Sequence, residues 1–507
     1  MIPISRRRFL AQAVVAATAT AVPRAAFGAK ESPLAAQLAA DLLRPQYHLL
    51  PAANWMNDPN GPIFYQGRYH MFFQYNPDGA FWGDMHWAHA TSPDMIHWEH
   101  EPVAIAPTPD GYDRDGVFSG SIVLDGNTPT AIYTGVAPPA TPAGTTLDDG
   151  HHKWREVQCL ATSTDKALRT WQKLPEPIIA RPPEGMNVLG FRDPGVWREG
   201  DDWLMTLGSG TKEKGGLVLI YKSRDLRQWE YLHPLVESTA SGRPVTNPVS
   251  SGVMWECPDF FPLGDRYVLL YAAQHRVWWK TGTYQDRRFT PQKEGVLDGG
   301  SYYAAKSMLD AKGTRILWGW IPETRPLADY KAAGWAGLMA LPRVLTIGAD
   351  GGLETEVVPA AQGLRSRIMS VPPSFGPQKE KALKEVRLRN LCGEIQAEFM
   401  PGQPFTLKLV SEAGDRFAQI DYDPQQRGTE LRINEFRASI ATDQPVHLRC
   451  LLDGSSLEVF ANRQASITAR VYQIPRGPLQ LEVANLAGLR LLDAWDIKPI
   501  SKDRLTR

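Results

Sequence analysis

A short motif that ends in tryptophan recurs three times in the first half of the chain, at residues 92–98, 163–171 and 223–229. Each copy begins with Ser and has Asp two positions later, at 94, 165 and 225, which sets a period of 60 to 71 residues. Strand-like runs joined by short turns precede the copies, as in 62–65 and 68–74 around Gln66-Gly67. A period of this length with about four short strands is typical of a β-propeller blade. Residues 57–345 have room for about five such blades.

The composition changes near Pro372-Pro373 and Gly376-Pro377, after a segment, 360–368, that is predicted to form a short linking helix. Short alternating strands then resume, and Asp453-Gly454 marks a hairpin turn between two of them. These patterns predict an all-β chain, namely a five-bladed β-propeller at 45–358, a linker at 359–377 and a β-sandwich at 378–500. The 43 Gly and 41 Pro agree with many turns rather than long helices.

The first residues have the character of an export signal. Ser5-Arg6-Arg7-Arg8-Phe9-Leu10 is followed by an apolar, Ala-rich run to Val22 and by small residues at 26–29. This order predicts a twin-arginine signal peptide over 1–29 and a periplasmic or secreted protein, with a basic start on a cytosolic helix as the alternative. The apolar run is too short to span a bilayer, and no later run is long enough.

Charge and cysteine content exclude other classes. Lys plus Arg and Asp plus Glu both number 55, so the basic excess of a nucleic-acid-binding protein is missing. The four Cys lack the paired spacing of a zinc site and are too few for a disulfide framework. Cys392 and Cys450 could pair after export, although the sequence does not fix their separation. The oligomeric state is left open.

Three carboxylates stand where blades begin: Asp58, Asp193 and Glu256, separated by 135 and 63 residues, which is about two blades and one blade. The first strands of propeller blades line the central axis, so these side chains are expected to meet in one pocket. Glycoside hydrolysis uses such a cluster, in which one carboxylate attacks the anomeric carbon and another protonates the leaving oxygen. The plainer alternative is that the two Asp are turn residues before Pro and that Glu256 is a surface acid.

Aromatic and amide side chains follow these acids closely in the sequence. Sugars present apolar C–H faces and many hydroxyls, which suit stacking rings with amide and hydroxyl partners. Most Trp residues are expected to fill blade cores, and ligand contact is predicted only for Trp55, Trp82 and Trp335.

The stretch 55–61, Trp-Met-Asn-Asp-Pro-Asn-Gly, resembles the signature of glycoside hydrolase family 32, the invertase, inulinase and levanase family. Further blocks resemble the family in the same order, at 73–77, 118–121, 191–194, 256–259 and 334–337. The resemblance covers residues 45–345 closely and 451–462 more loosely. A five-bladed propeller followed by a sandwich is also the architecture of that family.

The resemblance implies a role for each matching position. Asp58 matches the nucleophile, Glu256 the general acid/base and Asp193 the transition-state stabiliser. Substrate-binding roles are expected at Asn57, Trp55, Gln74, Trp82, Phe118, Ser119, Arg192 and Trp335. The implied reaction is retaining cleavage of a terminal β-D-fructofuranosyl unit from sucrose or a fructan, without a metal or another cofactor.

Three rival functions use a similar pocket. A fructosyltransferase has the same acids but passes the fructosyl group to a sugar. An inverting propeller glycosidase would hold its two carboxyls farther apart, and a lectin-like propeller would be expected to lack Asp58 or Glu256. The loops 138–152 and 185–189 are predicted near the mouth of the pocket, where they would affect the choice among sucrose, inulin and levan.

The sandwich is expected to cover one side of the propeller rather than to act as a separate lectin module. Its strands have apolar faces that need a partner, and no cluster of exposed aromatics is evident. Cys257, which follows Glu256 directly, is expected to be buried and structural.

Overall fold

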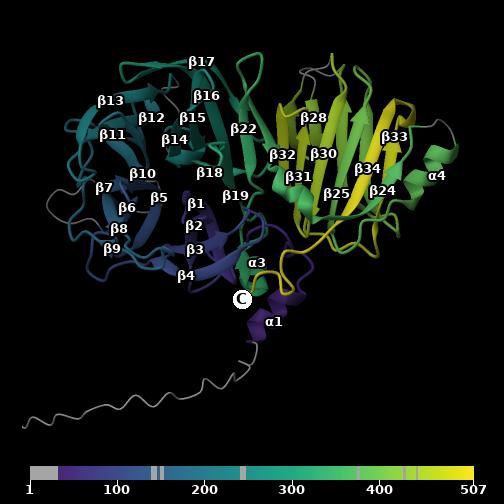
Figure 1. The fold of residues 1–507 in the computed structure, drawn as a ribbon, viewed down its shortest axis with the longest axis horizontal. Helices are drawn as coiled ribbons and strands as arrows, with labels where there is room; N and C mark the ends of the chain where they lie inside the picture. The colour runs from purple at the N-terminus through teal and green to yellow at the C-terminus, as the bar shows by residue number, and fades with distance from the viewer. Residues whose placement is uncertain are drawn as a thin grey trace, which may run out of the picture.

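A computed structural model describes residues 32–138, 146–148, 153–239, 247–373, 377–425, 430–440 and 443–506. Two bodies of strands lie side by side, and the last described residues lie between them (Figure 1). Five sheets form the larger body, a propeller, and two sheets form the smaller one, a sandwich. The predicted all-β fold of a five-bladed propeller and a sandwich is therefore confirmed.

Each propeller sheet has an antiparallel core of four strands. The first two sheets hold β1 (Asn54–Tyr65), β2 (Arg68–Asn76), β3 (His86–Ser92) and β4 (Glu99–Ile105), then β5 (Gly116–Asp125), β6 (Thr128–Ala137), β7 (Thr146–Asp148), β8 (Lys153–Thr162) and β9 (Gln172–Lys173). The third and fourth hold β10 (Val188–Glu199), β11 (Asp202–Thr211), β12 (Gly215–Ser223) and β13 (Glu230–Glu237), then β14 (Glu256–Leu263), β15 (Arg266–Ala273), β16 (Arg276–Gln285) and β17 (Arg288–Val296). The fifth holds β18 (Tyr303–Leu309), β19 (Arg315–Ile321), β21 (Leu338–Met339), β22 (Arg343–Ile347) and β23 (Leu353–Val357).

The first strands of the five blades contact one another in a closed ring, in the order β1, β5, β10, β14 and β18. Strand β20 (Trp335–Ala336) helps to close the ring, because it lies between strands of the last blade in sequence but pairs in parallel with β1 of the first blade. The Ser-Asp-Trp motif forms the outer turn of three blades. In the turn after β12, for example, the Asp225 carboxylate accepts the backbone N–H groups of Arg227 and Gln228, a side-chain substitute for turn hydrogen bonds.

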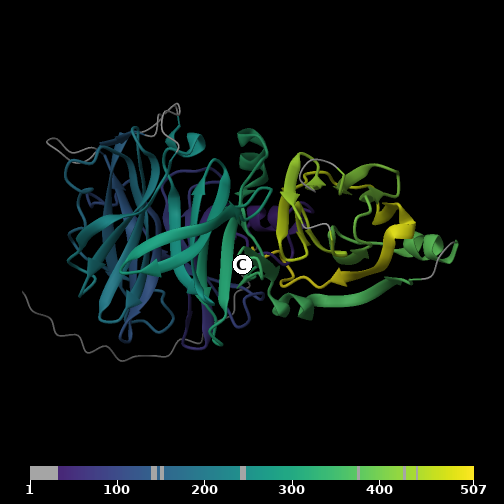
Figure 2. The same ribbon diagram turned by 90° about the horizontal axis from the view of Figure 1, so that it is seen from above.

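The sandwich encloses one apolar core between its two sheets. The first sheet has the order β24 (Arg365–Val371), β34 (Leu489–Ile497), β25 (Cys392–Phe399), β30 (Val446–Asp453), β31 (Ser456–Ala461) and β32 (Ala465–Arg470). The second has the order β29 (Phe436–Ser439), β28 (Glu430–Ile433), β27 (Arg416–Asp423), β26 (Phe405–Ser411) and β33 (Leu479–Ala484). Strands β31 and β32 lie on the side that faces the propeller (Figures 1 and 2).

The segment between the two bodies differs from its prediction. The predicted linking helix over 360–368 is shorter than expected, because η1 (Pro359–Leu364) is a 3-10 helix and β24 starts at Arg365. Strand β24 pairs with β34 at the edge of the sandwich, so part of the predicted linker 359–377 belongs to that domain. The remaining helical elements are α1 (Pro33–Ala40), α2 (Pro248–Ser251), α3 (Leu327–Ala333), α4 (Pro377–Glu385) and η2 (Leu486–Gly488).

A group of buried charged residues holds the two bodies together, and we call it the junction network: His48, Asp298, Arg343, Asp453 and Glu458. Arg343 of the propeller donates to Asp298 at 2.9 Å and to Glu458 of the sandwich at 2.7 Å. The His48 ring lies 2.8 Å from Asp453 and 3.0 Å from Glu458. Asp453 also accepts the backbone N–H groups of Gln46, Tyr47 and His48, so the segment 46–48 is fixed against the sandwich.

All four cysteines are buried free thiols. Cys392 and Cys450, for which a disulfide was considered, are not paired. No helix of the described residues is long and apolar enough to cross a membrane. The predicted signal peptide 1–29 lies outside the described residues, as does most of the loop 138–152. The loop 185–189 is described but does not line the pocket at the propeller axis.

Candidate active site

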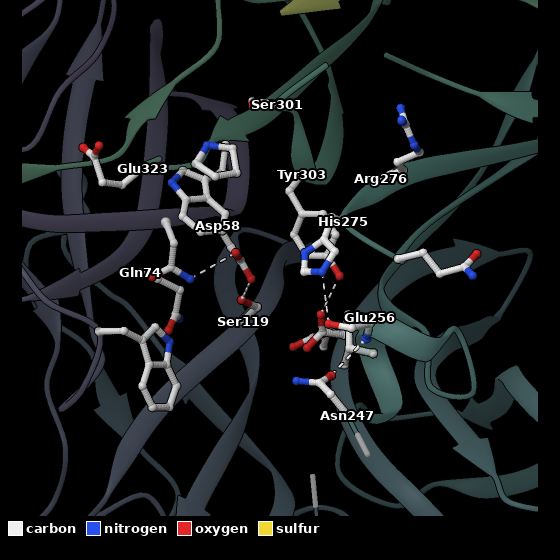
Figure 3. Close-up of a pocket in the computed structure, with 18 of the residues that line it drawn as sticks. Asp58, Gln74, Ser119, Asn247, Glu256, His275, Arg276, Ser301, Tyr303 and Glu323 are labelled. Atoms are coloured by element: carbon white, nitrogen blue, oxygen red, sulfur yellow. Dashed lines mark hydrogen bonds between the residues drawn. The ribbon is translucent and has the colours of Figure 1, made fainter. Parts of the chain in front are cut away.

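A pocket of about 830 Å³ opens at the propeller axis and brings together nine of the eleven residues that the sequence pointed to (Figure 3). They are Asn57, Asp58, Gln74, Trp82, Phe118, Ser119, Arg192, Asp193 and Glu256. Asp58 and Glu256 face each other across this hollow, although 198 residues separate them in the chain. One common cavity is the arrangement that a two-carboxylate mechanism needs.

A β-bulge in the first strand of each blade explains how the side chains reach the axis. The register with the second strand shifts between 56 and 59, 117 and 120, 192 and 195, 256 and 259, and 303 and 306. Bulges re-aim side chains, and they are common beside active sites. Asp193 lies inside one of them with a φ of 65°, a conformation that costs a non-glycine residue free energy and is tolerated where the surroundings hold it in place.

Three neighbours orient Asp58. The Ser119 hydroxyl donates to Oδ2 at 2.6 Å, and Asn57 Nδ2 donates to Oδ1 at 3.0 Å. The amide of Asn57 is itself fixed, because the Trp55 indole N–H donates to its oxygen at 2.7 Å. The carboxylate is thereby held in one orientation, with its negative charge supported by two donors.

Glu256 is held from two sides. Arg192 donates to its Oε1 through Nε at 3.0 Å and Nη2 at 2.8 Å. The Tyr303 hydroxyl donates to Oε2 at 2.8 Å. Arg192 is anchored from behind by the buried Glu156, whose Oε1 accepts from Nη1 at 2.8 Å. The second carboxylate is thus fixed in position while its outer edge remains open to the pocket.

Cys257 contacts both Asp193 and Asp58. The Cys257 backbone N–H donates to Asp193 Oδ2 at 2.9 Å. The thiol lies 3.4 Å from Asp58 Oδ2 and 3.5 Å from Asp193 Oδ2. Burial, with the negative charges of Asp193 and Asp58 beside it, raises the pKa of Cys257, so the thiol stays neutral. Cys257 is buried, as the sequence predicted.

The pocket holds more negative than positive charge. Burial raises the pKa of Asp58, and the charge of Glu256 adds to that effect, while its donors oppose it. Burial also raises the pKa of Asp193 to about 7, with Arg192 opposing and the two other acids reinforcing the shift. Carboxylates crowded in this way keep a proton near neutral pH. Among the described residues, no group of three or more His, Cys, Asp or Glu is arranged to hold a metal ion.

Two of the predicted contact residues do not reach the pocket. Trp335 is completely buried; its indole N–H donates to Asp41, and the guanidinium of Arg325 stacks on its ring. It does not line the pocket, so its predicted contact with a ligand remains a prediction without support from this cavity. Trp55 is also buried and acts through Asn57 rather than at the pocket surface.

Sequence reasoning missed several lining residues: Trp154, Asn247, Ser250, Gln274, His275, Arg276, Ser301, Tyr303, Trp320, Glu323 and Phe436. Tyr303 could have been found, because it opens the fifth blade just as Glu256 opens the fourth. Trp154 lies on β8, which is not a first strand, and Phe436 comes from the sandwich, so blade phase gives no signal for either one.

Family models match both parts of the chain. The model described as "Glycosyl hydrolases family 32 N-terminal domain" matches residues 48–356, and "Glycosyl hydrolases family 32 C terminal" matches residues 380–494. The chain belongs to glycoside hydrolase family 32. As a member of this family it is a glycoside hydrolase of the β-fructofuranosidase type.

Individual family 32 proteins agree with this membership. A sucrose-6-phosphate hydrolase of Escherichia coli is 35% identical over 461 residues, which is 85% of this chain and 90% of the relative. A levanase of Bacillus subtilis is 31% identical over 510 residues, covering 90% of this chain and 70% of the relative. The crystal structure of fructan 1-exohydrolase IIa from Cichorium intybus is 28% identical, with a TM-score of 0.74, covering 90% of this chain and 98% of that one.

Proposed function

We propose that the enzyme releases terminal β-D-fructofuranosyl units from sucrose, from fructans such as inulin and levan, or from both. We also propose that it works by double displacement with retention of configuration. The observation that carries this proposal is that Asp58 and Glu256 face one cavity while each is held by its own donors. Asp58 is the nucleophile, Glu256 the general acid/base and Asp193 the stabiliser of the transition state.

In the first step, a carboxylate oxygen of Asp58 forms a bond to the anomeric carbon of the fructosyl unit. The bond between that carbon and the leaving oxygen breaks, and Glu256 gives its proton to the leaving oxygen. In the second step, water gives a proton to Glu256 and its oxygen bonds to the anomeric carbon. Asp58 is then released as a carboxylate, so both residues return to their starting state.

The hydrogen bonds around the acids support these roles. The donors Ser119 and Asn57 hold Asp58 in place for attack. Arg192 and Tyr303 hold Glu256 in place to give a proton to the leaving oxygen. Asp193 has the proposed role of accepting hydrogen bonds from hydroxyls of the fructosyl ring, an interaction that strengthens as positive charge develops on the sugar.

Initial rates on sucrose, inulin and levan, with product analysis at low and high sucrose, test the substrate assignment. Fructose release is expected, without growth of longer oligosaccharides at high sucrose. Longer products that dominate at high sucrose would indicate a fructosyltransferase. NMR of the first product formed should show β-fructofuranose before mutarotation, and the α anomer as first product would refute double displacement.

We propose separately that residues 1–29 direct export by the twin-arginine route, so that the enzyme is periplasmic or secreted. The support is the order of Arg6-Arg7, the apolar run and the small residues. A fusion of residues 1–29 to a reporter that is active only after export tests the proposal. The reporter should be active with the native pair and inactive with Arg6→Lys plus Arg7→Lys. Equal activity of both fusions would refute this route.

A further inference from the structure

The active-site pocket crosses the boundary between the two domains. Beyond the carboxylates, its wall includes Ser301, Glu323 and Thr324 of the propeller, and Phe436 of the sandwich. Phe436 starts β29 and pairs with Ile433 across the turn that joins β28 to β29. Its ring is half-buried, with one part packed on the sandwich core and another part available to the pocket. Within the described chain, it is the only sandwich residue in this lining.

Close backbone contacts fix this part of the wall. The Gly299 N–H donates to Ser466 O at 2.8 Å, and the Ser301 N–H donates to Thr468 O at 2.7 Å. A Cβ at Gly300 would lie 2.0 Å from Thr468 O, and a Cβ at Gly299 would lie 2.2 Å from Arg437 O. The loop 299–301 therefore lies directly against β32 and β29, which sets the position of Phe436 relative to Ser301.

Ser301 connects this wall to the acid/base through Tyr303. Ser301 is two residues before Tyr303, and the Tyr303 hydroxyl donates to Glu256. In the proposed mechanism, the leaving group departs on the side of Glu256 and away from Asp58. A leaving group longer than one sugar ring can therefore extend past Tyr303 toward Ser301 and Phe436.

The chemistry of the wall suits a neutral sugar. Glu323 is paired with Arg325 at 2.8 Å and accepts the Tyr472 hydroxyl at 2.5 Å. Burial opposes its ionisation, but Arg325 and Arg470 lower the pKa of Glu323 to about 2, so it forms a balanced ion pair. An apolar ring next to hydroxyl side chains and an ion-paired Glu323 fits the alternating C–H faces and hydroxyls of a sugar.

We propose that Phe436 and Ser301 form a distal subsite that binds the second ring of the leaving group in a neutral oligosaccharide of three or more units. The subsite rests on the proposed fructoside hydrolysis and adds a preference for longer chains. Sucrose, with one ring in its leaving group, does not reach it. The sandwich thus supplies a specificity-determining residue and is more than a cover for the propeller.

Steady-state kinetics on sucrose and on the β-2,1-linked trisaccharide test this subsite. The measured quantity is the ratio of kcat/KM for the trisaccharide to kcat/KM for sucrose. Phe436→Ala and Phe436→Leu should each lower the ratio about five- to tenfold, as expected for the loss of one aromatic contact. Phe436→Tyr keeps the ring and should keep the ratio. Met400→Ala removes another exposed apolar side chain of the sandwich and should leave the ratio unchanged.

Phe436→Leu preserves most of the core packing, so it gives a result even if Phe436→Ala does not fold. An unchanged ratio in a folded Phe436→Leu enzyme would overturn the subsite. If His275→Ala lowers the ratio and Phe436→Leu does not, the substrate extends past the β15–β16 turn instead. That result would also overturn the subsite. A wild-type enzyme without activity on either sugar would refute the proposed function itself, which is a different result from an unchanged ratio.

Discussion

The catalytic pocket and the junction network both bury several charged groups, but they balance charge differently. In the pocket, Asp58, Asp193 and Glu256 lie in one cavity with Arg192, whose guanidinium pairs with Glu256 and with the buried Glu156. In the junction network, Glu458 contacts both Arg343 and His48, and these cations also reach Asp298 and Asp453.

The pKa values of buried carboxylates shift in opposite directions in the catalytic pocket and in the junction network. Burial raises the pKa of Asp58 and of Asp193 in the pocket. At the junction, burial also opposes ionisation, but Arg343 and His48 lower the pKa of Glu458 to about 2. Glu458, which contacts two cations, is therefore easier to ionise in the folded protein than in the unfolded chain. Asp58 and Asp193 are harder to ionise in the folded protein, and carboxylates of this kind are typical of active sites.

The largest expected effect is that of Asp58→Ala. Removal of the proposed nucleophile should lower kcat on sucrose by about 10⁴-fold or more. The melting temperature at pH 7 should be unchanged or higher, because a raised pKa means that the ionised carboxylate destabilises the fold above its unfolded pKa. Kinetics and thermal unfolding on the same preparation provide both measurements.

Asp265→Ala is the matched control, since this Asp is exposed in the turn between β14 and β15. It should keep full activity. An Asp58→Ala enzyme that hydrolyses sucrose at a tenth of the wild-type rate would contradict the nucleophile assignment.

Glu256→Gln should have the next largest effect. Loss of the proposed proton donor should reduce kcat/KM on sucrose by about 10²- to 10⁴-fold. The reduction should be much smaller on a fructoside whose leaving group departs without a proton, such as an activated aryl fructoside. Equal reductions on the two substrates would assign Glu256 a role other than acid catalysis.

Glu458→Gln tests the other side of the comparison. It removes the one carboxylate that contacts both Arg343 and His48, which should lower the free energy of unfolding by about 3 to 5 kcal/mol. Chemical denaturation measures this change. Below the new melting temperature, the variant should keep most of its specific activity, because Glu458 does not line the pocket. A large loss of activity without a loss of stability would mean that the junction network affects catalysis in the pocket.

The pH dependence of stability should give the smallest of these effects. Burial disfavours the charged ring of His48, but hydrogen bonds to Asp453 and Glu458 raise its pKa to about 9. Its contribution is therefore complete below about pH 6.5 and is lost as the pH rises through about 9, up to about 3 kcal/mol in total. His48→Gln should remove this decline from a plot of unfolding free energy between pH 6 and pH 9. A wild-type plot that is flat over this range would contradict the prediction.

The recurring Ser-Asp-Trp motif predicted the propeller, and the spacing of the three acids relative to the blades predicted most of the pocket. Residues that open blades are brought together by any propeller, so Asp58, Asp193 and Glu256 could be found from spacing. Trp335 could not be placed correctly, because β20 leaves its own blade to pair with β1. Phe436 depends on how the two domains dock, and β24 was hidden because its partner β34 lies more than 100 residues farther along the chain.

The anchoring of residues 46–48 by Asp453 has a consequence for biosynthesis. Residues 46–48 cannot reach their final place until residue 453, about 400 residues later, has been made. Native docking of the two domains is thus completed only after β30 of the sandwich, which ends at Asp453, has been synthesised. A finished, folded molecule is the cargo that the proposed twin-arginine route carries.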